Sequence, residues 1–120
     1  KQRILLGTFI TSREEYGKWY KKAVLVRLAL RRKILELFRE FDFLISPTMP
    51  VLPWKFGEIK SGLEMYQMDI LTVLANIVGI PAGSVPIDKF IGFQVMSNLL
   101  NDAKVLELMY AIEQKFRVNL

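Results

Sequence analysis

One uncharged segment, from Ile70 to Ile87, most constrains what this chain can fold into. It is long enough to raise the question of a membrane-spanning helix, but Pro81 and Pro86 interrupt it, together with glycines and an asparagine. Because proline removes a backbone donor and clashes with the preceding turn, no continuous apolar helix can span these positions. The segment therefore predicts buried core within a folded domain, and we expect no membrane partner.

A long amphipathic helix is predicted from about residue 12 to residue 40. Apolar side chains recur along one arc of this segment, and most charged side chains lie opposite. Ser12 is the expected N-cap, and two acidic residues follow it in the first turn. Arg27 falls inside the apolar arc, where it is either a structural arginine, snorkelling or paired with a carboxylate, or a site residue.

The rest of the chain alternates between strands and helices. Helices are expected at about residues 63–78 and 102–116, and strands at about 42–46, 82–87 and 91–97. Three prolines between residues 47 and 53 predict a stiff, extended loop after the first strand. This order predicts an α/β fold with helices packed on a mixed sheet. Such short strands would leave edges uncovered around residues 43–46 and 91–97, so we expect the chain to be part of a larger sheet.

The chain contains no histidine and no cysteine, which removes whole classes of chemistry from it. Ser-His-Asp and Cys-His catalysis, disulfides, and metal sites built on histidine or cysteine are excluded for this chain alone. Neither common glycine-rich phosphate-binding motif occurs. We therefore expect the chain to bind no metal ion or other cofactor by itself. Composition leaves open a serine activated by a lysine.

The first long helix carries a basic face, and the whole chain has a formal net charge of +5. Its cationic side chains lie close in sequence: Lys21, Lys22, Arg27, Arg31, Arg32, Lys33 and Arg39. One hypothesis is therefore a basic helical module that binds RNA or a partner protein. The alternative is a solvated helix surface, balanced in part by Glu36 and Glu40, because no recognisable nucleic-acid-binding module accompanies the face.

The helix predicted at 63–78 carries a narrow polar stripe. Its members project within one arc, and almost every other position is apolar: Met65, Asp69, Thr72 and Asn76 form the stripe. A helix that is apolar on nearly all sides is buried, so the stripe must face partners or a cavity. A buried carboxylate needs a cation or several donors. Asp69 is therefore either part of an internal salt bridge or cap, or a ligand contact, and the spacing leaves both open.

Several motifs follow one another in an order typical of one family. They are Arg3–Phe9 (RILLGTF), Tyr16–Lys22 (YGKWYKK), Phe41–Pro50 (FDFLISPTMP), Met65–Asp69 (MYQMD), and the pieces AN and GIPA between Ala75 and Ala82. Over nearly the whole chain these motifs resemble the C-terminal region of amidase-signature enzymes. The opening motif and MYQMD are similar, more narrowly, to the A subunits of the aspartyl/glutamyl-tRNA amidotransferases.

The resemblance implies a fold and the extent of the domain. It implies a three-layer α/β/α architecture with a mixed sheet, of which residues 1–120 form the C-terminal portion of a single domain. In the family an N-terminal part supplies a catalytic Ser-Ser-Lys triad, and no serine or lysine of this chain matches it. We therefore expect the chain alone to be inactive. The short link Asp88-Lys89-Phe90 departs from the longer turn of relatives, so the edge of the site there is expected to differ.

The resemblance also implies two substrate-binding residues. In the family, an arginine at the position of Arg3 and an aspartate at the position of Asp69 hold the α-carboxylate and α-ammonium groups of glutamine. A zwitterionic ligand needs one fixed cation and one fixed anion, and a guanidinium suits a carboxylate in two-point contact. Tyr66, Thr72 and Asn76 are expected to support this pair.

For the parent protein, the resemblance implies a glutamine-hydrolysing subunit. The absence of cysteine and of a signal peptide in the sequence favours a cytoplasmic setting. Ammonia from glutamine would pass to a partner subunit, which uses ATP and magnesium to convert Glu-tRNA(Gln) or Asp-tRNA(Asn) to the amide. The expected partners are the N-terminal part of the same polypeptide, the B and C subunits, and, indirectly, tRNA. The alternatives are another amidase-family hydrolase, disfavoured by the presence of both Arg3 and Asp69, and the basic module described above.

Overall fold

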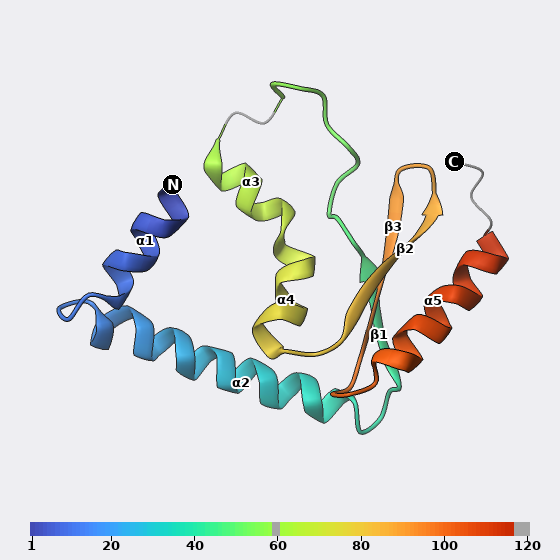
Figure 1. Ribbon diagram of the computed structural model, residues 1–120, viewed down its shortest axis with the longest axis horizontal. Coiled ribbons are helices and arrows are strands. Elements are labelled where there is room, and N and C mark those ends of the chain that lie inside the picture. The colour runs from blue at the N-terminus through green and yellow to red at the C-terminus, as the bar shows by residue number, and fades with distance from the viewer. Residues whose placement is uncertain (59–60, 117–120) are drawn as a thin grey trace.

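The computed structural model describes residues 1–58 and 61–116 of the chain (Figure 1). Its elements are α1 (Gln2–Thr11), η1 (Tyr16–Tyr20), α2 (Lys21–Leu37), β1 (Phe43–Pro47), α3 (Gly62–Met68), α4 (Ile70–Val78), β2 (Ala82–Asp88), β3 (Ile91–Ser97) and α5 (Asp102–Phe116). The predicted strands at 42–46, 82–87 and 91–97 are confirmed to within one residue at each end, and the helix predicted at 102–116 is confirmed as α5.

The long helix predicted from residue 12 to residue 40 is wrong in its first part. Ser12 is not an N-cap, because it ends α1, where its N–H donates to the Phe9 carbonyl (3.1 Å). The chain then turns and passes through η1, a wide π-helical turn, before the regular helix α2. Gly17 lies inside η1, where its low helix propensity weakens a regular helix. The rings of Tyr16 and Tyr20 stack across η1 with their centroids 4.7 Å apart.

The helix predicted at 63–78 is divided at Asp69 into α3 and α4. A capping box starts α3: the Glu64 N–H donates to Ser61 Oγ (3.2 Å), and the Ser61 N–H donates to Glu64 Oε2 (3.3 Å). At Asp69 the backbone departs from ideal helical angles, with ψ at −2°. Aspartate favours helix ends over helix interiors, which fits a break at this residue.

The uncharged segment Ile70–Ile87 forms α4, the turn after it and most of β2. Buried positions recur along it: Ala75, Val78, Ile80 and Val85. The prediction that this segment contributes to the core is therefore confirmed at these positions. Within residues 1–58 and 61–116, no helix is long and apolar enough to cross a membrane.

β3 is the central strand of a three-stranded sheet with the order β1-β3-β2. Both pairs are antiparallel, and Leu44 of β1 and Ala82 of β2 lie opposite Met96 of β3 from either side. The mixed sheet predicted from the sequence is therefore not what the described residues form. The expectation of an uncovered edge at 91–97 is also wrong, because β3 pairs along both of its edges. β1 and β2 form the edges of the described sheet.

Helices pack on both faces of this sheet. On one face, Val95 is fully buried opposite Gly83, and α5 covers both. A Cβ at Gly83 would overlap the sulfur of Met109 on α5, so a larger residue there would require this flexible side chain to move. On the other face α4 and the second half of α2 share a core cluster: Ala75, Val78, Ile80 and Met96, with Ile34, Leu35 and Phe38 packed against it. The complete three-layer architecture implied by the resemblance stays a prediction.

The described chain is flat and extended, with dimensions of 53 × 42 × 17 Å. Its radius of gyration is 17.3 Å, whereas a compact chain of this length has a radius of about 14 Å. α1 and the first half of α2 extend away from the sheet (Figure 1). Large apolar side chains on these helices are exposed, among them Ile4 (74%), Leu5 (69%) and Leu25 (65%).

Candidate functional site

Asp69, the predicted anionic site residue, lies at the junction between α3 and α4 and is half-buried. Its main-chain carbonyl accepts hydrogen bonds from the Thr72 hydroxyl (3.1 Å) and the Val73 N–H (2.9 Å). These bonds start α4 and fix the backbone from which the carboxylate projects. The positive end of the α4 dipole favours a negative charge at this position. The junction therefore presents a well-defined anionic group.

The three residues expected to support Asp69 lie on the same two helices. Thr72 is half-buried, and its hydroxyl is held by the Asp69 carbonyl. Asn76 is exposed, and its Nδ2 donates to the Thr72 carbonyl (3.1 Å). Tyr66 is 45% exposed on α3. The structure therefore brings Thr72 to Asp69 directly, while Asn76 bonds to its own helix one turn further on.

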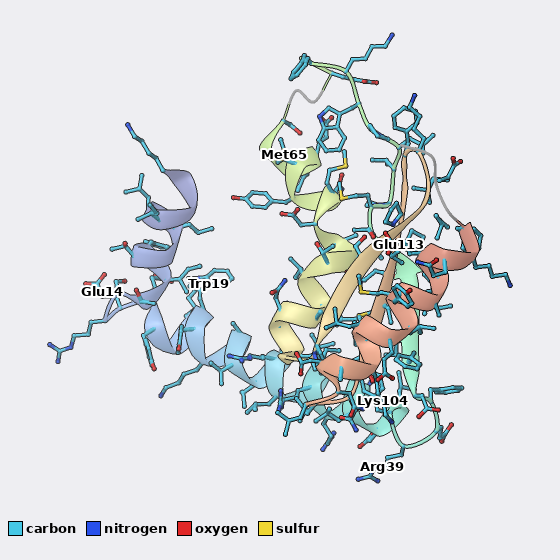
Figure 2. All side chains as sticks on the ribbon, turned by 45° about the vertical axis from the view of Figure 1, so that its right-hand side comes forward. Glu14, Trp19, Arg39, Met65, Lys104 and Glu113 are labelled. Atoms are coloured by element: carbon cyan, nitrogen blue, oxygen red, sulfur yellow. The ribbon has the colours of Figure 1, made fainter. Side chains whose placement is uncertain are left out.

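The expectation that this helical segment is buried on nearly all sides is wrong for the described chain. No residue of α3 is buried, and Ala75 and Val78 are the buried residues of α4. Leu63 and Ile70 are 69% and 64% exposed. Met65, a member of the predicted polar stripe, is 46% exposed on α3 (Figure 2). The surface around Asp69 is thus open and bordered by apolar side chains.

Arg3, the predicted cationic partner, belongs to the first turn of α1, and its side chain lies outside the described part of the structure. α2 runs along the base of the molecule, and α1 rises from one end of it (Figure 1). α4 and α3 rise from the same side of α2. The topology therefore places the helix that carries Arg3 and the junction that carries Asp69 on one side of α2.

A polar band that was not predicted from the sequence lies on the sheet beside the start of α4. Gln94 of β3 is only 4% exposed, and its Nε2 donates to the Leu71 carbonyl (3.1 Å) and to Ser46 Oγ (3.2 Å). On the same face the hydroxyls of Thr48 and Ser84 share a hydrogen bond. Ser46 and Ser84 lie opposite Gln94 in the two neighbouring strands. The band supplies neutral donors and acceptors next to the helix that begins at Asp69.

Arg27 and Arg31 have partners in the last turn of α4. Arg27 Nε donates to the Ile77 carbonyl (2.9 Å), and Arg31 Nη1 donates to the Val78 carbonyl. The hypothesis that Arg27 is a structural arginine is confirmed, although its partner is a main-chain carbonyl rather than a carboxylate. Two members of the predicted basic face thus bond inside the chain, which weakens the RNA-binding hypothesis.

The proline-rich loop and the short turn between β2 and β3 line an apolar cavity of about 540 Å³. Trp54 and Phe90 are among its walls, and no ionisable side chain lines it. In the part of the chain that the structure describes, no three acidic side chains gather into a group that could hold a metal ion. This cavity therefore adds no charged side chain to the candidate site at Asp69.

Comparison with known proteins agrees with this arrangement. A family model described as Amidase matches residues 1–106. The A subunit of the glutamyl-tRNA(Gln) amidotransferase from Saccharolobus solfataricus is 44% identical over 119 residues, which cover 95% of this chain and 25% of that protein. The protein of the same name from Halothermothrix orenii is 42% identical over 119 residues, which cover 95% of this chain and 25% of that protein.

The fold is similar to a solved structure as well. The crystal structure of the glutamyl-tRNA(Gln) amidotransferase A subunit from Thermotoga maritima matches with a TM-score of 0.77 and 36% identity, over 94% of this chain and 26% of that chain. The chain therefore spans about a quarter of the length of these relatives. Since the family model covers most of the sequence and the fold agrees with it, this chain belongs to the amidase family.

Proposed function

We propose that this chain is the glutamine-binding part of the glutamine-hydrolysing A subunit of a tRNA-dependent amidotransferase. Similarity to proteins named as the A subunits of glutamyl-tRNA(Gln) amidotransferases, over 95% of this chain, supports the assignment of the parent protein. The observation that carries the binding role is the half-buried Asp69 at the start of α4, beside the polar band of the sheet. Arg3 of α1 is the proposed cationic counterpart.

Glutamine carries an α-ammonium and an α-carboxylate group, so its recognition requires a fixed charge of each sign. In this proposal the Asp69 carboxylate accepts hydrogen bonds from the ammonium, and the Arg3 guanidinium donates two hydrogen bonds to the carboxylate. Tyr66, Thr72 and Asn76 shape the surroundings of Asp69. With both ends of the amino acid held, the side-chain amide stays in one place, and such orientation lowers the barrier to reaction.

The rest of the parent protein supplies the reaction itself. A serine attacks the side-chain amide of glutamine, ammonia leaves, and water releases glutamate from the acyl-enzyme. We place this serine outside the chain, because no serine of this chain matches the catalytic motif of the family. Three of the described serine hydroxyls also bond neutral partners: Ser46 with Gln94, Ser84 with Thr48, and Ser97 with the main-chain carbonyl of Asp42.

Ammonia then passes to a partner subunit, in an assembly completed by the B and C subunits. There, ATP and magnesium serve to activate the Glu-tRNA(Gln) or Asp-tRNA(Asn) that is converted to the amide. The chain described here binds neither of these cofactors in this proposal. Its contribution is to hold the amino acid that provides the nitrogen.

Replacing Asp69 with asparagine in the complete enzyme tests the binding role, because the change keeps the size and removes the charge. The lost charge-assisted hydrogen bond is worth about 1.5–3 kcal/mol. Since each step of about 1.4 kcal/mol is tenfold in affinity, the KM for glutamine is expected to rise about tenfold to a hundredfold. Arg3→Lys is expected to weaken glutamine binding as well, since an ammonium cannot reproduce the two-point contact.

Free ammonia as the nitrogen donor is the control, because it bypasses glutamine binding. Ammonia-dependent amidation is expected to stay near the wild-type rate in both variants. Asp42→Asn makes the same chemical change at an exposed aspartate between α2 and β1. It is expected to leave the activity with glutamine and the activity with ammonia unchanged. If Asp69→Asn abolishes both activities and the protein melts earlier, Asp69 is a structural residue and the proposed role is wrong.

A further inference from the structure

Two arginines join α2 to the C-terminal end of α4. Arg27 donates to the carbonyl of Ile77, and Arg31 donates to the carbonyl of Val78. These are the last two residues of α4, and the carbonyls at a helix end have no partner within the helix. Because Arg27 and Arg31 lie four positions apart, they project from the same face of α2 and reach the same helix end. We call this pair the arginine clamp.

The arginine clamp suits its site electrostatically. The C-terminal end of a helix carries partial negative charge, so cationic donors are favoured there over neutral ones. α4 ends at Gly79, which has a left-handed backbone with φ of +73°. A Cβ at Gly79 would lie 3.4 Å from Arg31 Nη1, an ordinary van der Waals distance, so it is the left-handed backbone that favours glycine beside the guanidinium.

The clamp also marks where close packing between α2 and α4 ends. On the C-terminal side of the clamp, Ile34 and Leu35 of α2, and Phe38 directly after it, pack against the core cluster. Around Arg27 and toward the N-terminal end of α2, a cavity of about 470 Å³ opens between α2 and Ile77, and Arg27, Tyr20, Ala23, Val24 and Leu30 are among its walls. The first half of α2, together with η1 and α1, therefore projects from the clamp as an arm (Figure 1).

We propose that Arg27 and Arg31 are positioning residues for glutamine binding: by fixing α2 to α4, they set where Arg3 on α1 stands relative to Asp69. Asp69 lies at one end of α4, and the clamp holds the other end. Arg3 lies at the far end of the arm. A small change in the angle between α2 and α4 therefore displaces Arg3, at the end of the arm, by more than it displaces the residues beside the clamp. This inference rests on the proposed function of Arg3 and Asp69.

The test uses the complete parent protein in its assembly, with spin labels at Thr8 of α1 and Gln67 of α3, both exposed. Arg27→Met and Arg31→Met keep the apolar stem and remove the donors. We expect the distance between the labels to shift or its distribution to broaden. The KM for glutamine is expected to rise about threefold to tenfold, as for one lost hydrogen bond, while kcat with ammonia stays unchanged.

Two further variants separate positioning from general stability. Arg32→Met removes an exposed cation of the same helix, whose Nε lies 3.9 Å from Glu36 Oε1, and it is expected to leave the label distance and the KM unchanged. Arg27→Lys keeps a cation able to donate to one carbonyl. Its label distance and its KM for glutamine are expected to lie closer to the wild-type values than those of Arg27→Met.

An unchanged label distance in Arg27→Met and Arg31→Met would overturn the positioning role and leave Asp69 as a glutamine ligand. A shifted distance with a wild-type KM would overturn it too, since the arm would then move without consequence for binding. If Asp69→Asn itself leaves the glutamine KM unchanged, the proposed function fails, and the role of the clamp in glutamine binding fails with it.

Discussion

At the scale of single residues, the buried amide of Gln94 ties three elements together. It joins β3 to β1 through Ser46 and to α4 through the Leu71 carbonyl. Gln94→Met keeps the volume and removes the donors, which is expected to destabilise the parent protein by about 1 kcal/mol for each lost hydrogen bond. Thermal unfolding measures this, with Gln67→Met on the exposed surface of α3 as the matched control. Equal melting temperatures for the two variants would contradict a structural role for Gln94.

Residues that are out of character with their surroundings are the ones that the sequence singles out; the structural role of Arg27 is confirmed, and the binding role of Asp69 stays a prediction. A carboxylate in an apolar helix singled out Asp69, and a guanidinium in an apolar arc singled out Arg27. Gln94 and Ser84 gave no such signal, because polar residues are ordinary on one face of a strand. Only the pairing of three strands shows that these polar side chains meet on the same face beneath α4.

At the scale of elements, the C-terminal end of α4 depends on glycine. At Gly79 the backbone is left-handed, which costs an L-residue with a side chain roughly 1–2 kcal/mol. Gly79→Ala is therefore expected to lower the unfolding temperature of the parent protein. Gly62→Ala is the matched control, because Gly62 begins α3 with no atom near its missing Cβ, and alanine there is expected to be neutral or stabilising. A larger loss in Gly62→Ala than in Gly79→Ala would contradict this account.

The elements with local signals were predicted well, and the breaks between helices were not. Strand patterns and turn residues place β1, β2 and β3 within a residue, and the apolar pattern of residues 102–116 places α5. The apolar periodicity continues nearly unchanged across the breaks at Asp69 and around Gly17, so the sequence pattern predicts one continuous helix at each of these places. α1 was not predicted, because its apolar side chains stay largely exposed in the described chain and form no clear buried face, as Ile4, Leu5 and Phe9 show.

At the scale of the whole molecule, the flat shape and the exposed apolar helices show that the chain does not complete its own core. β1 and β2 are sheet edges, and unpaired edges favour association with other strands. We expect the isolated chain to self-associate, which sedimentation at several concentrations measures, and to release no glutamate from glutamine. A monomer with a sharp cooperative melt, or glutamate release above a matched blank, would contradict the view that the rest of the parent protein completes this domain.

The central claim is that Asp69 binds the α-ammonium group of glutamine, and competitive inhibition of the complete enzyme tests it most directly. Glutamate and glutarate differ by that ammonium group alone, so comparing their inhibition constants in wild type and Asp69→Asn forms a double-mutant cycle between residue and ligand. In the wild type, glutarate is expected to bind about tenfold to a hundredfold more weakly than glutamate. In Asp69→Asn this difference is expected to collapse. A difference that persists unchanged in the variant would show that the ammonium binds elsewhere and would contradict the account.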